Sequence, residues 1–180
     1  MLGDYLKSRG LPVERLFEPT KGHWGMKIRK LLMEGRGETP PDEELSWFIN
    51  DRKEDVEKNI RPALAEKKIV LLDRYYYSTA AYQGALGLDP LKICRDNEIF
   101  APKPDRVFLF TTSPEHCLDR IRKSREEHST FERLDYLQKV QTIFDSFSDP
   151  VIHRIDSIPP AEEVHGKLRR EVDALLSLPR

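Results

Sequence analysis

The chain has 180 residues, and its 30 basic residues nearly balance 31 acidic ones, which gives a formal net charge of −1. This balance argues against a protein that coats DNA or RNA, because such proteins are strongly basic. The longest purely apolar runs fall far short of the roughly 20 residues that cross a bilayer, and no secretory signal opens the chain. The cysteines Cys94 and Cys117 form no CxxC motif. We therefore expect a cytoplasmic protein that binds neither nucleic acid nor membrane.

Four short segments are predicted to be strands. Val13–Phe17 and Val151–Ile155 are the weaker candidates, whereas Ile69–Leu72 and Val107–Phe110 are continuous apolar runs typical of strands buried on both faces. Helical patterns lie between these segments. The alternation predicts an α/β fold, with a doubly wound parallel sheet and helices on both faces, in one domain over residues 1–180.

The helical segments carry their own signals. Leu2–Arg9 reads as a helix that precedes the first strand, and a long helix opens at Pro40-Pro41-Asp42 and continues to about Leu64. Pro62 is expected to bend or interrupt that long helix, because proline lacks the amide hydrogen. Pro114 is placed as a first-turn proline after a cap. The last helix has an apolar stripe made of Val164, Leu168, Val172 and Leu175.

Candidate chemistry follows the strands, because ligands of open parallel sheets bind at the carboxyl ends of the strands. Among the residues that follow the strands, the pair that most strongly suggests a function is Asp73 and Arg74, after the second strand. An aspartate there can serve as an outer ligand for phosphate-bound Mg²⁺, and the adjacent arginine can clamp a phosphate with two N–H groups. A salt-bridged turn explains the same two residues equally well.

Two further groups have both a functional and an ordinary interpretation. Phe48 and Arg52 lie four residues apart on one helix face, where a ring could stack on a base and a guanidinium could bond its edge. Taken alone, they are more typical of a core phenylalanine and a solvated arginine. The basic group Arg120, Arg122, Lys123 and Arg125 precedes a polar stretch and could act as a lid over a phosphoryl-transfer site. An exposed basic helix end is the ordinary explanation.

One expected motif is missing from the sequence. A nucleotide kinase of this class carries GxxxxGK[ST] after its first strand, and none of the nine glycines fits that pattern. Gly166-Lys167, for example, is followed by Leu168 within a helical pattern.

Several segments taken together resemble the thymidylate kinase family. The most specific is the run from Asp73-Arg74-Tyr75 through Ser78 to Tyr82-Gln83-Gly84, which is similar to the family's "DRY..S..AYQG". In chain order, the other matching segments are Glu18-Pro19-Thr20 with Gly25 and Ile28-Arg29, Phe48 with Arg52, Ile60 to Leu64, Pro104-Asp105, Pro114-Glu115 with Arg120, and Phe131-Glu132. Several motifs in the right order make a chance match improbable.

The resemblance implies a site for thymidine monophosphate, dTMP. It implies that Arg74 binds the phosphate, that Phe48 stacks on thymine and that Arg52 bonds a base carbonyl. It also implies that Tyr82 packs against the deoxyribose and disfavours a 2′-hydroxyl. The remaining substrate-binding residues implied by the motifs are Glu18, Ser78, Thr79 and Gln83.

The resemblance also implies the reaction. ATP would donate its γ-phosphoryl group to dTMP, with Mg²⁺ or its water shell oriented by Asp73. A lid at about residues 120–131 would place Arg122 or Arg125 at the transferred group and Arg120 at the ATP side. Family members form homodimers, so a homodimer is expected. Discrimination between dTMP and dUMP depends on one methyl group, which the sequence does not resolve.

The sequence departs from the family at two places. Phe17 stands where an arginine is expected before Glu18, which removes a possible phosphate contact. The family's first, central strand and its phosphate-binding loop precede a helix whose tail resembles Tyr5 to Gly10, and neither is present in this sequence. We expect an N-terminally truncated thymidylate kinase. The alternative is a catalytically inactive homologue or partner protein that binds dTMP.

Overall fold

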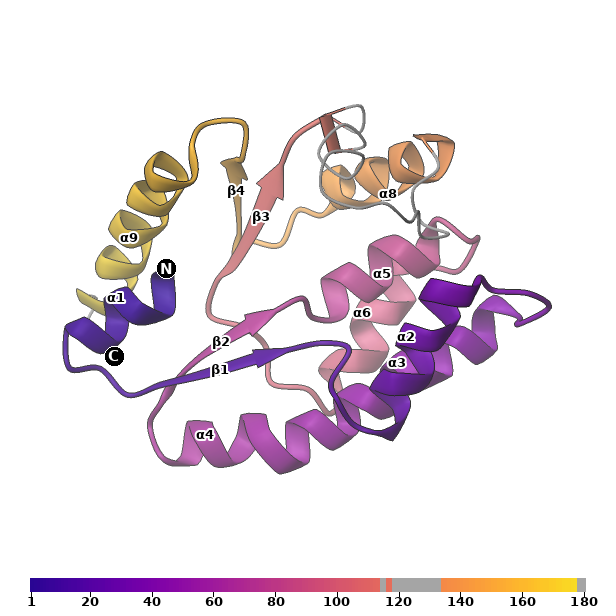
Figure 1. The fold of residues 1–180 in the computed structure, drawn as a ribbon, viewed down its shortest axis with the longest axis horizontal. Coiled ribbons are helices and arrows are strands. Elements are labelled where there is room, and N and C mark those ends of the chain that lie inside the picture. Colours follow the sequence, from indigo (N-terminus) through magenta and orange to yellow (C-terminus); the bar gives the residue numbers. More distant parts are fainter. Residues whose placement is uncertain (114–115, 118–133, 178–180) are drawn as a thin grey trace.

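The computed structural model describes residues 1–113, 116–117 and 134–177 (Figure 1). Pro114, which was predicted to begin a helix after its cap, lies outside these ranges, and so does the predicted lid at about residues 120–131. In chain order the elements are α1 (Leu2–Ser8), β1 (Val13–Phe17), α2 (His23–Glu34), α3 (Pro41–Asp55), a π-helical turn (Val56–Ile60), α4 (Arg61–Ala65), β2 (Ile69–Asp73), α5 (Tyr76–Gly84), α6 (Pro90–Glu98), β3 (Val107–Thr111), α8 (Leu134–Ser146), β4 (Ile152–Asp156) and α9 (Ala161–Ser177).

The four strands confirm the predicted segments to within one residue at each end. β1 pairs with β2 in parallel, from Val13 opposite Ile69 to Phe17 opposite Asp73. β3 pairs with β4 in the same sense, from Val107 opposite Ile152 to Thr111 opposite Asp156. The α/β class and the parallel strands are thus as expected.

The predicted single sheet is divided into two sheets of two strands, β1-β2 and β3-β4. Each strand therefore has one hydrogen-bonded neighbour among the described residues, and Figure 1 shows the two pairs as separate ribbons. The prediction that Ile69–Leu72 and Val107–Phe110 are buried on both faces is wrong. β2 is half-buried except for its exposed last residue, and Phe110 on β3 is 52% exposed. Open strand edges leave these apolar side chains with fewer neighbours.

The long helix does not break at Pro62. Residues 41–65 stay helical because a π-helical turn over Val56–Ile60 ends two residues before this proline, and the Arg61 amide donates to the Val56 carbonyl five residues earlier. Proline cannot donate to the carbonyl four residues before it, and its ring crowds that carbonyl. The wider turn accommodates both effects locally, so the helix continues to Ala65.

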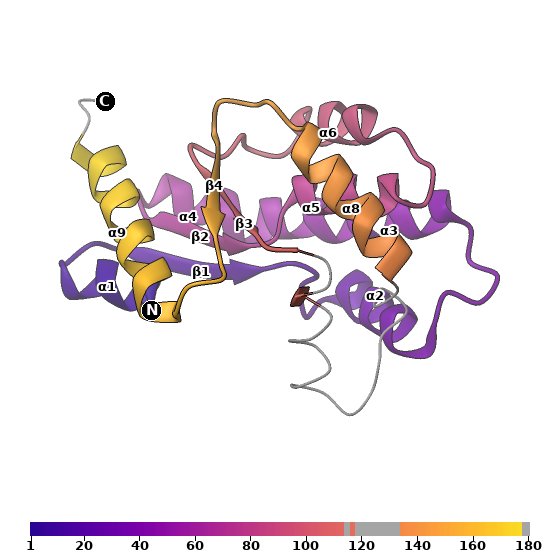
Figure 2. The same cartoon turned by 90° about the horizontal axis from the view of Figure 1, so that it is seen from above.

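The largest core cluster lies among α5, α6 and α8, and it includes Tyr76, Ala80, Ile93 and Val140. A smaller cluster joins α2 to α3, and a third joins β4 to α9. At one end of the molecule α1 lies against α9 (Figure 2), where the Tyr5 hydroxyl donates to an oxygen of Asp173 at 2.6 Å. Among the described helices, none has both the length and the apolar character needed to span a membrane.

Candidate functional site

The carboxyl ends of β1 and β2 lie side by side. The Glu18 amide donates to the Asp73 carbonyl at 3.0 Å, which continues the strand pairing one residue past β1. Glu18 enters a cis peptide bond with Pro19, and Arg74 leaves β2 with a φ of 68°. The predicted strand-end residues are therefore neighbours at one edge, as parallel pairing requires.

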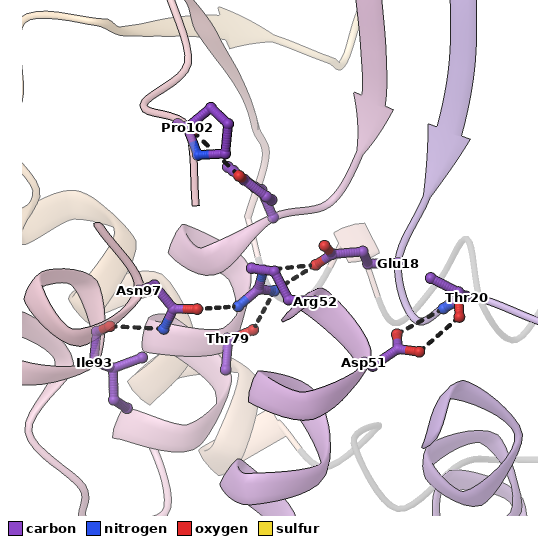
Figure 3. Close-up of polar contacts among 9 residues, drawn as sticks. Glu18, Thr20, Asp51, Arg52, Thr79, Ile93, Asn97 and Pro102 are labelled. Carbon is purple, nitrogen blue, oxygen red and sulfur yellow. Dashed lines mark hydrogen bonds and ion pairs between the residues drawn. The ribbon is translucent and has the colours of Figure 1, made fainter. Parts of the chain in front are cut away.

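Arg52 on α3 is the centre of a buried polar network (Figure 3). The Arg52 side chain is 1% exposed, and both Nε and Nη2 donate to Glu18 Oε2, with the Nε bond at 2.9 Å. Nη2 also donates to Thr79 Oγ1 at 3.0 Å, and Nη1 donates to Asn97 Oδ1 at 2.7 Å. The interpretation of Arg52 as a solvated arginine is wrong, because four of its five N–H groups bond buried protein atoms.

Glu18 is 6% exposed, and its Oε1 has no hydrogen-bond partner, whereas Oε2 takes both bonds from Arg52. Burial raises the pKa of Glu18 to about 7, although the positive charge of Arg52 opposes this rise. The carboxylates of Asp55 and Asp51 add to the rise in the Glu18 pKa. The site thus holds several buried acidic groups around one guanidinium.

Asp51 fixes the turn that follows β1. Its carboxylate accepts a bond from the Thr20 amide at 2.7 Å and another from the Thr20 hydroxyl at 2.6 Å (Figure 3). Arg29 on α2 donates to the carbonyls of Pro19 and Thr20. The segment Glu18-Pro19-Thr20 is therefore held by side chains from two helices.

Arg74 and Tyr82 form a second contact at the carboxyl end of β2. The Arg74 guanidinium carbon lies 5.4 Å from the centre of the Tyr82 ring, which is half-buried on α5. Asp73 and Arg74 are both exposed. Because both side chains face solvent, a charged ligand can reach them. Their charges are opposite, so one can attract a cation and the other an anion.

A cavity of about 160 Å³ opens beside Tyr82. Its lining comes from Tyr82, Cys117, the end of β3 at residues 109–112, and α8. The cavity joins the Tyr82 ring to the carboxyl end of β3, which is where parallel α/β sheets bind ligands.

The other predicted residues have separate surroundings. Gln83 is fully buried and donates to Glu44 Oε1 at 2.7 Å. Phe48 is half-buried and packs on the α2–α3 cluster of Ile28, Leu31 and Trp47. Ser78 lies in the first turns of α5, half-buried. The predicted lid arginines Arg120, Arg122 and Arg125 lie outside the described residues.

Sequence reasoning missed several polar residues of these networks. Asn97 is fully buried on α6, where its Nδ2 donates to the Ile93 carbonyl at 2.8 Å and its Oδ1 faces Arg52. Its position four residues after Ile93, on the same helix face, is the signal that could have identified it. Glu44, Arg36 and Tyr136 were also missed: Arg36 and Glu44 meet across the connection between α2 and α3, and Tyr136 lies 100 positions from Arg36.

Comparison with known proteins decides the family. Residues 1–168 match the sequence profile described as Thymidylate kinase. The chain is 46% identical to a thymidylate kinase of Desulfotalea psychrophila over 179 residues, which cover 99% of this chain and 88% of that protein. It is 40% identical to a probable thymidylate kinase of Archaeoglobus fulgidus, with 98% and 88% of the two chains covered. The chain belongs to the thymidylate kinase family.

The thymidylate kinase family consists of nucleoside monophosphate kinases with an α/β fold, and the parallel strands described above agree with that fold. A third relative, a thymidylate kinase of Brachyspira hyodysenteriae, is 36% identical over 179 residues and covers 99% of this chain and 87% of its own. The matched region includes both networks, that of Arg52 and that of Arg74 with Tyr82.

Proposed function

We propose that this thymidylate kinase family member transfers the γ-phosphoryl group of ATP to dTMP, giving dTDP and ADP. The observation that carries the proposal is the family match, which spans residues 1–168 and includes the strand end at Asp73 and Arg74. In phosphoryl transfer a protein acts mainly by positioning the reactants and stabilising charge. Exposed charged side chains at a strand end are suited to that task.

In this proposal dTMP lies across α5. Arg74 binds the monophosphate, because a guanidinium can give two parallel hydrogen bonds to phosphate oxygens. Tyr82, whose ring the Arg74 guanidinium faces, packs against the deoxyribose. Phe48 stacks on the base, and Ser78, Thr79 and Gln83 contact base or phosphate. Glu44 accepts a hydrogen bond from Gln83 and so holds its side chain.

Arg52 has a narrower role than the motif alone implies. Four of its N–H groups already hold Glu18, Thr79 and Asn97, so one N–H on Nη1 remains for a base carbonyl. Its side chain is 1% exposed, and a base therefore reaches it only when covering groups move aside. The hydrogen-bonded pair of Arg52 and Glu18 forms part of the wall of the proposed base site and holds that wall in place.

Mg²⁺ fits the donor set at the end of β2. Mg²⁺ usually keeps several waters and takes one or two carboxylates together with substrate phosphates. Asp73 supplies one exposed carboxylate there, and no group of three metal-ligating side chains occurs in the part of the chain described here. Asp73 would hold the ion or its water shell, and the bound ion would neutralise charge on the phosphates.

The ATP side of the proposal involves residues outside the described ranges and a phosphate-binding loop. Arg120 is proposed at the ATP side, and Arg122 or Arg125 at the transferred phosphoryl group. The sequence has no GxxxxGK[ST] motif, and β2 and β3 each have one hydrogen-bonded neighbour among the described strands. A strand paired to both, followed by a phosphate-binding loop, would supply the missing contacts to ATP.

A coupled assay of ADP release tests the proposal on two chains. The 180-residue chain is expected to show little or no turnover with dTMP and ATP, and a chain extended upstream through a GxxxxGK[ST] loop is expected to be active. Robust turnover by the shorter chain contradicts the proposed need for a GxxxxGK[ST] loop. Calorimetric binding of dTMP without turnover by either chain favours the inactive dTMP-binding homologue instead.

Three finer points belong to the same proposal. The protein acts on the small molecules dTMP and ATP, without nucleic acid or membrane as a partner. It forms a homodimer, which sedimentation at micromolar concentration checks. Its cytoplasmic location stays a prediction from the sequence, and a comparison of dTMP with dUMP measures the base preference.

A further inference from the structure

The Tyr136 hydroxyl caps the C-terminal end of α5. The last carbonyls of a helix have no partner within the helix and need one from elsewhere. At the end of α5, the Ala81 carbonyl accepts from the Ala85 amide and the Gln83 carbonyl from the Leu86 amide. Between them, the Tyr82 carbonyl accepts from the Tyr136 hydroxyl at 2.7 Å. A side chain from α8 thus fixes the backbone at Tyr82.

The Tyr136 hydroxyl also accepts a hydrogen bond. Arg36 Nη2 donates to the Tyr136 hydroxyl at 3.3 Å, and the Arg36 guanidinium carbon lies 5.4 Å from the Tyr136 ring. Arg36 Nε donates to Glu44 Oε2 at 2.7 Å, and Glu44 is fully buried. The orientation of the Tyr136 hydroxyl therefore depends on an ion pair anchored in α3.

The Tyr82 ring lies among three groups. The Tyr136 ring is 6.2 Å away at 60°, and the Phe144 ring is 6.4 Å away at 82°, both from α8. The Arg74 guanidinium lies near its face. The ring also lines the cavity at the end of β3. α8 thus determines where Tyr82 stands relative to Arg74 and to that cavity.

The geometry points to Tyr136 as a positioning residue that holds Tyr82 in the place where it distinguishes deoxyribose from ribose in the monophosphate substrate. This inference rests on the proposed function, because it assumes that dTMP lies against Tyr82. Tyr136 itself does not touch the substrate. It acts through the Tyr82 backbone and ring, from the first turn of α8.

The test compares Tyr136→Phe with Tyr77→Phe. Tyr136→Phe removes one hydroxyl and keeps the ring against Tyr82. Tyr77 is a matched control, because it lies on α5, is 7% exposed and donates its hydroxyl to Asp149 at 2.9 Å, away from Tyr82. Titration calorimetry of the 180-residue chain gives dissociation constants for dTMP and ribothymidine 5′-monophosphate. In the extended, active chain, KM and kcat for both nucleotides are measured.

The preference for dTMP over the ribonucleotide is expected to fall about threefold to tenfold in Tyr136→Phe, the range that one hydrogen bond supports. KM for dTMP should rise while kcat stays within about twofold, because the sugar contact is distant from the reacting phosphoryl group. Tyr77→Phe should lower thermal stability to a similar degree and leave the preference unchanged.

Two outcomes would overturn the inference. The first is an unchanged preference for dTMP in Tyr136→Phe. The second is an equal fall of the preference in Tyr77→Phe, which would indicate a general loosening of α5. Failure of the proposed function itself is recognised separately, because the unsubstituted chain would then neither bind dTMP nor, when extended, phosphorylate it.

Discussion

The guanidinium of Arg52 donates two hydrogen bonds to a single carboxylate oxygen of Glu18, and both side chains are buried. Removing one partner of such a pair leaves an uncompensated buried charge, which typically costs about 3–5 kcal/mol. We expect Arg52→Met to lower the free energy of unfolding by an amount in that range at pH 8. Urea denaturation followed by circular dichroism measures the loss.

The exposed pair of Lys58 and Glu54 on α3 and the π-helical turn is the control for Arg52. Lys58 Nζ lies 2.6 Å from Glu54 Oε2, but the Lys58 side chain is 67% exposed. Exposed pairs contribute little to stability, because water screens them. Lys58→Met should leave the urea midpoint nearly unchanged, and an equally large loss in both variants would argue against a special cost of burial.

The raised pKa of Glu18 predicts a pH dependence of stability. Burial raises this pKa from 4.5 to about 7 in the folded protein, so between these pH values the folded state holds a proton that the unfolded state has lost. The free energy of unfolding should therefore fall as pH rises from 4.5 to 7. Above that window the Glu18 contribution is constant.

Glu18→Gln isolates this contribution, because glutamine does not titrate. The difference in unfolding free energy between the original protein and Glu18→Gln should change by up to about 3 kcal/mol across the window, from 1.36 kcal/mol for each pKa unit. Urea denaturation at half-unit pH steps measures it. A difference that is flat from pH 4.5 to 8 would show that Glu18 is ionised throughout.

The strand ends were predictable, whereas the surroundings of Arg52 were not. The alternation of apolar runs with helical patterns identifies parallel strands, and the site was expected at their carboxyl ends. Parallel pairing brings these ends together, which is why Asp73 and Glu18 lie side by side in the structure. The spacing of Phe48 and Arg52 shows that they share a helix face but not what covers it. The covering residue Asn97 lies 45 positions further along the chain.

The burial of β2 and β3 was overestimated for a related reason. A run such as Ile69–Leu72 indicates a strand that suits a buried position, but burial depends on neighbours that the run itself does not specify. In the structure each of these strands has one partner strand among the described residues. The π-helical turn before Pro62 was missed because sequence rules mark a proline as a break and do not indicate how a helix adjusts.

Gly25 on α2 has no room for a side chain. A Cβ there would lie 2.0 Å from the Thr20 carbonyl oxygen, a backbone atom that also accepts a bond from Arg29. Because Asp51 holds the same turn, Gly25→Ala should lower the free energy of unfolding by about 1–3 kcal/mol, as overpacking does. Thermal or urea unfolding measures the change.

Gly166 in α9 is the matched glycine for that experiment. A Cβ at Gly166 would meet its nearest atom, in the Arg170 side chain, at 3.8 Å. Alanine is the better helix former by about 1 kcal/mol, so Gly166→Ala should stabilise the protein. If both alanine variants shift the unfolding midpoint in the same direction, the close approach at Gly25 is not what decides its effect.

Lys67 occupies a position that favours glycine. α4 ends in a Schellman motif, in which the Lys68 amide donates to the Ala63 carbonyl at 3.0 Å and the Lys67 amide to the Leu64 carbonyl at 2.9 Å. Lys67 has a φ of 58°, which is costly for a residue with a Cβ. Lys67→Gly should raise the free energy of unfolding by about 1 kcal/mol. Lys67→Ala keeps the Cβ and should give no gain in the urea midpoint.

Arg74 has the same backbone conformation, with a φ of 68°, but it stands at the proposed phosphate site. Arg74→Gly relieves a backbone cost of about 1–2 kcal/mol and loses the contact with the Tyr82 ring, worth about 0.5–1 kcal/mol, so the free energy of unfolding should rise by at most about 1.5 kcal/mol. Affinity for dTMP should fall at least about tenfold, because a charge-assisted phosphate contact is lost. Calorimetry of dTMP binding and urea denaturation measure the two effects separately. Unchanged affinity in a folded Arg74→Gly protein would remove Arg74 from the phosphate site and leave its left-handed backbone without a functional reason.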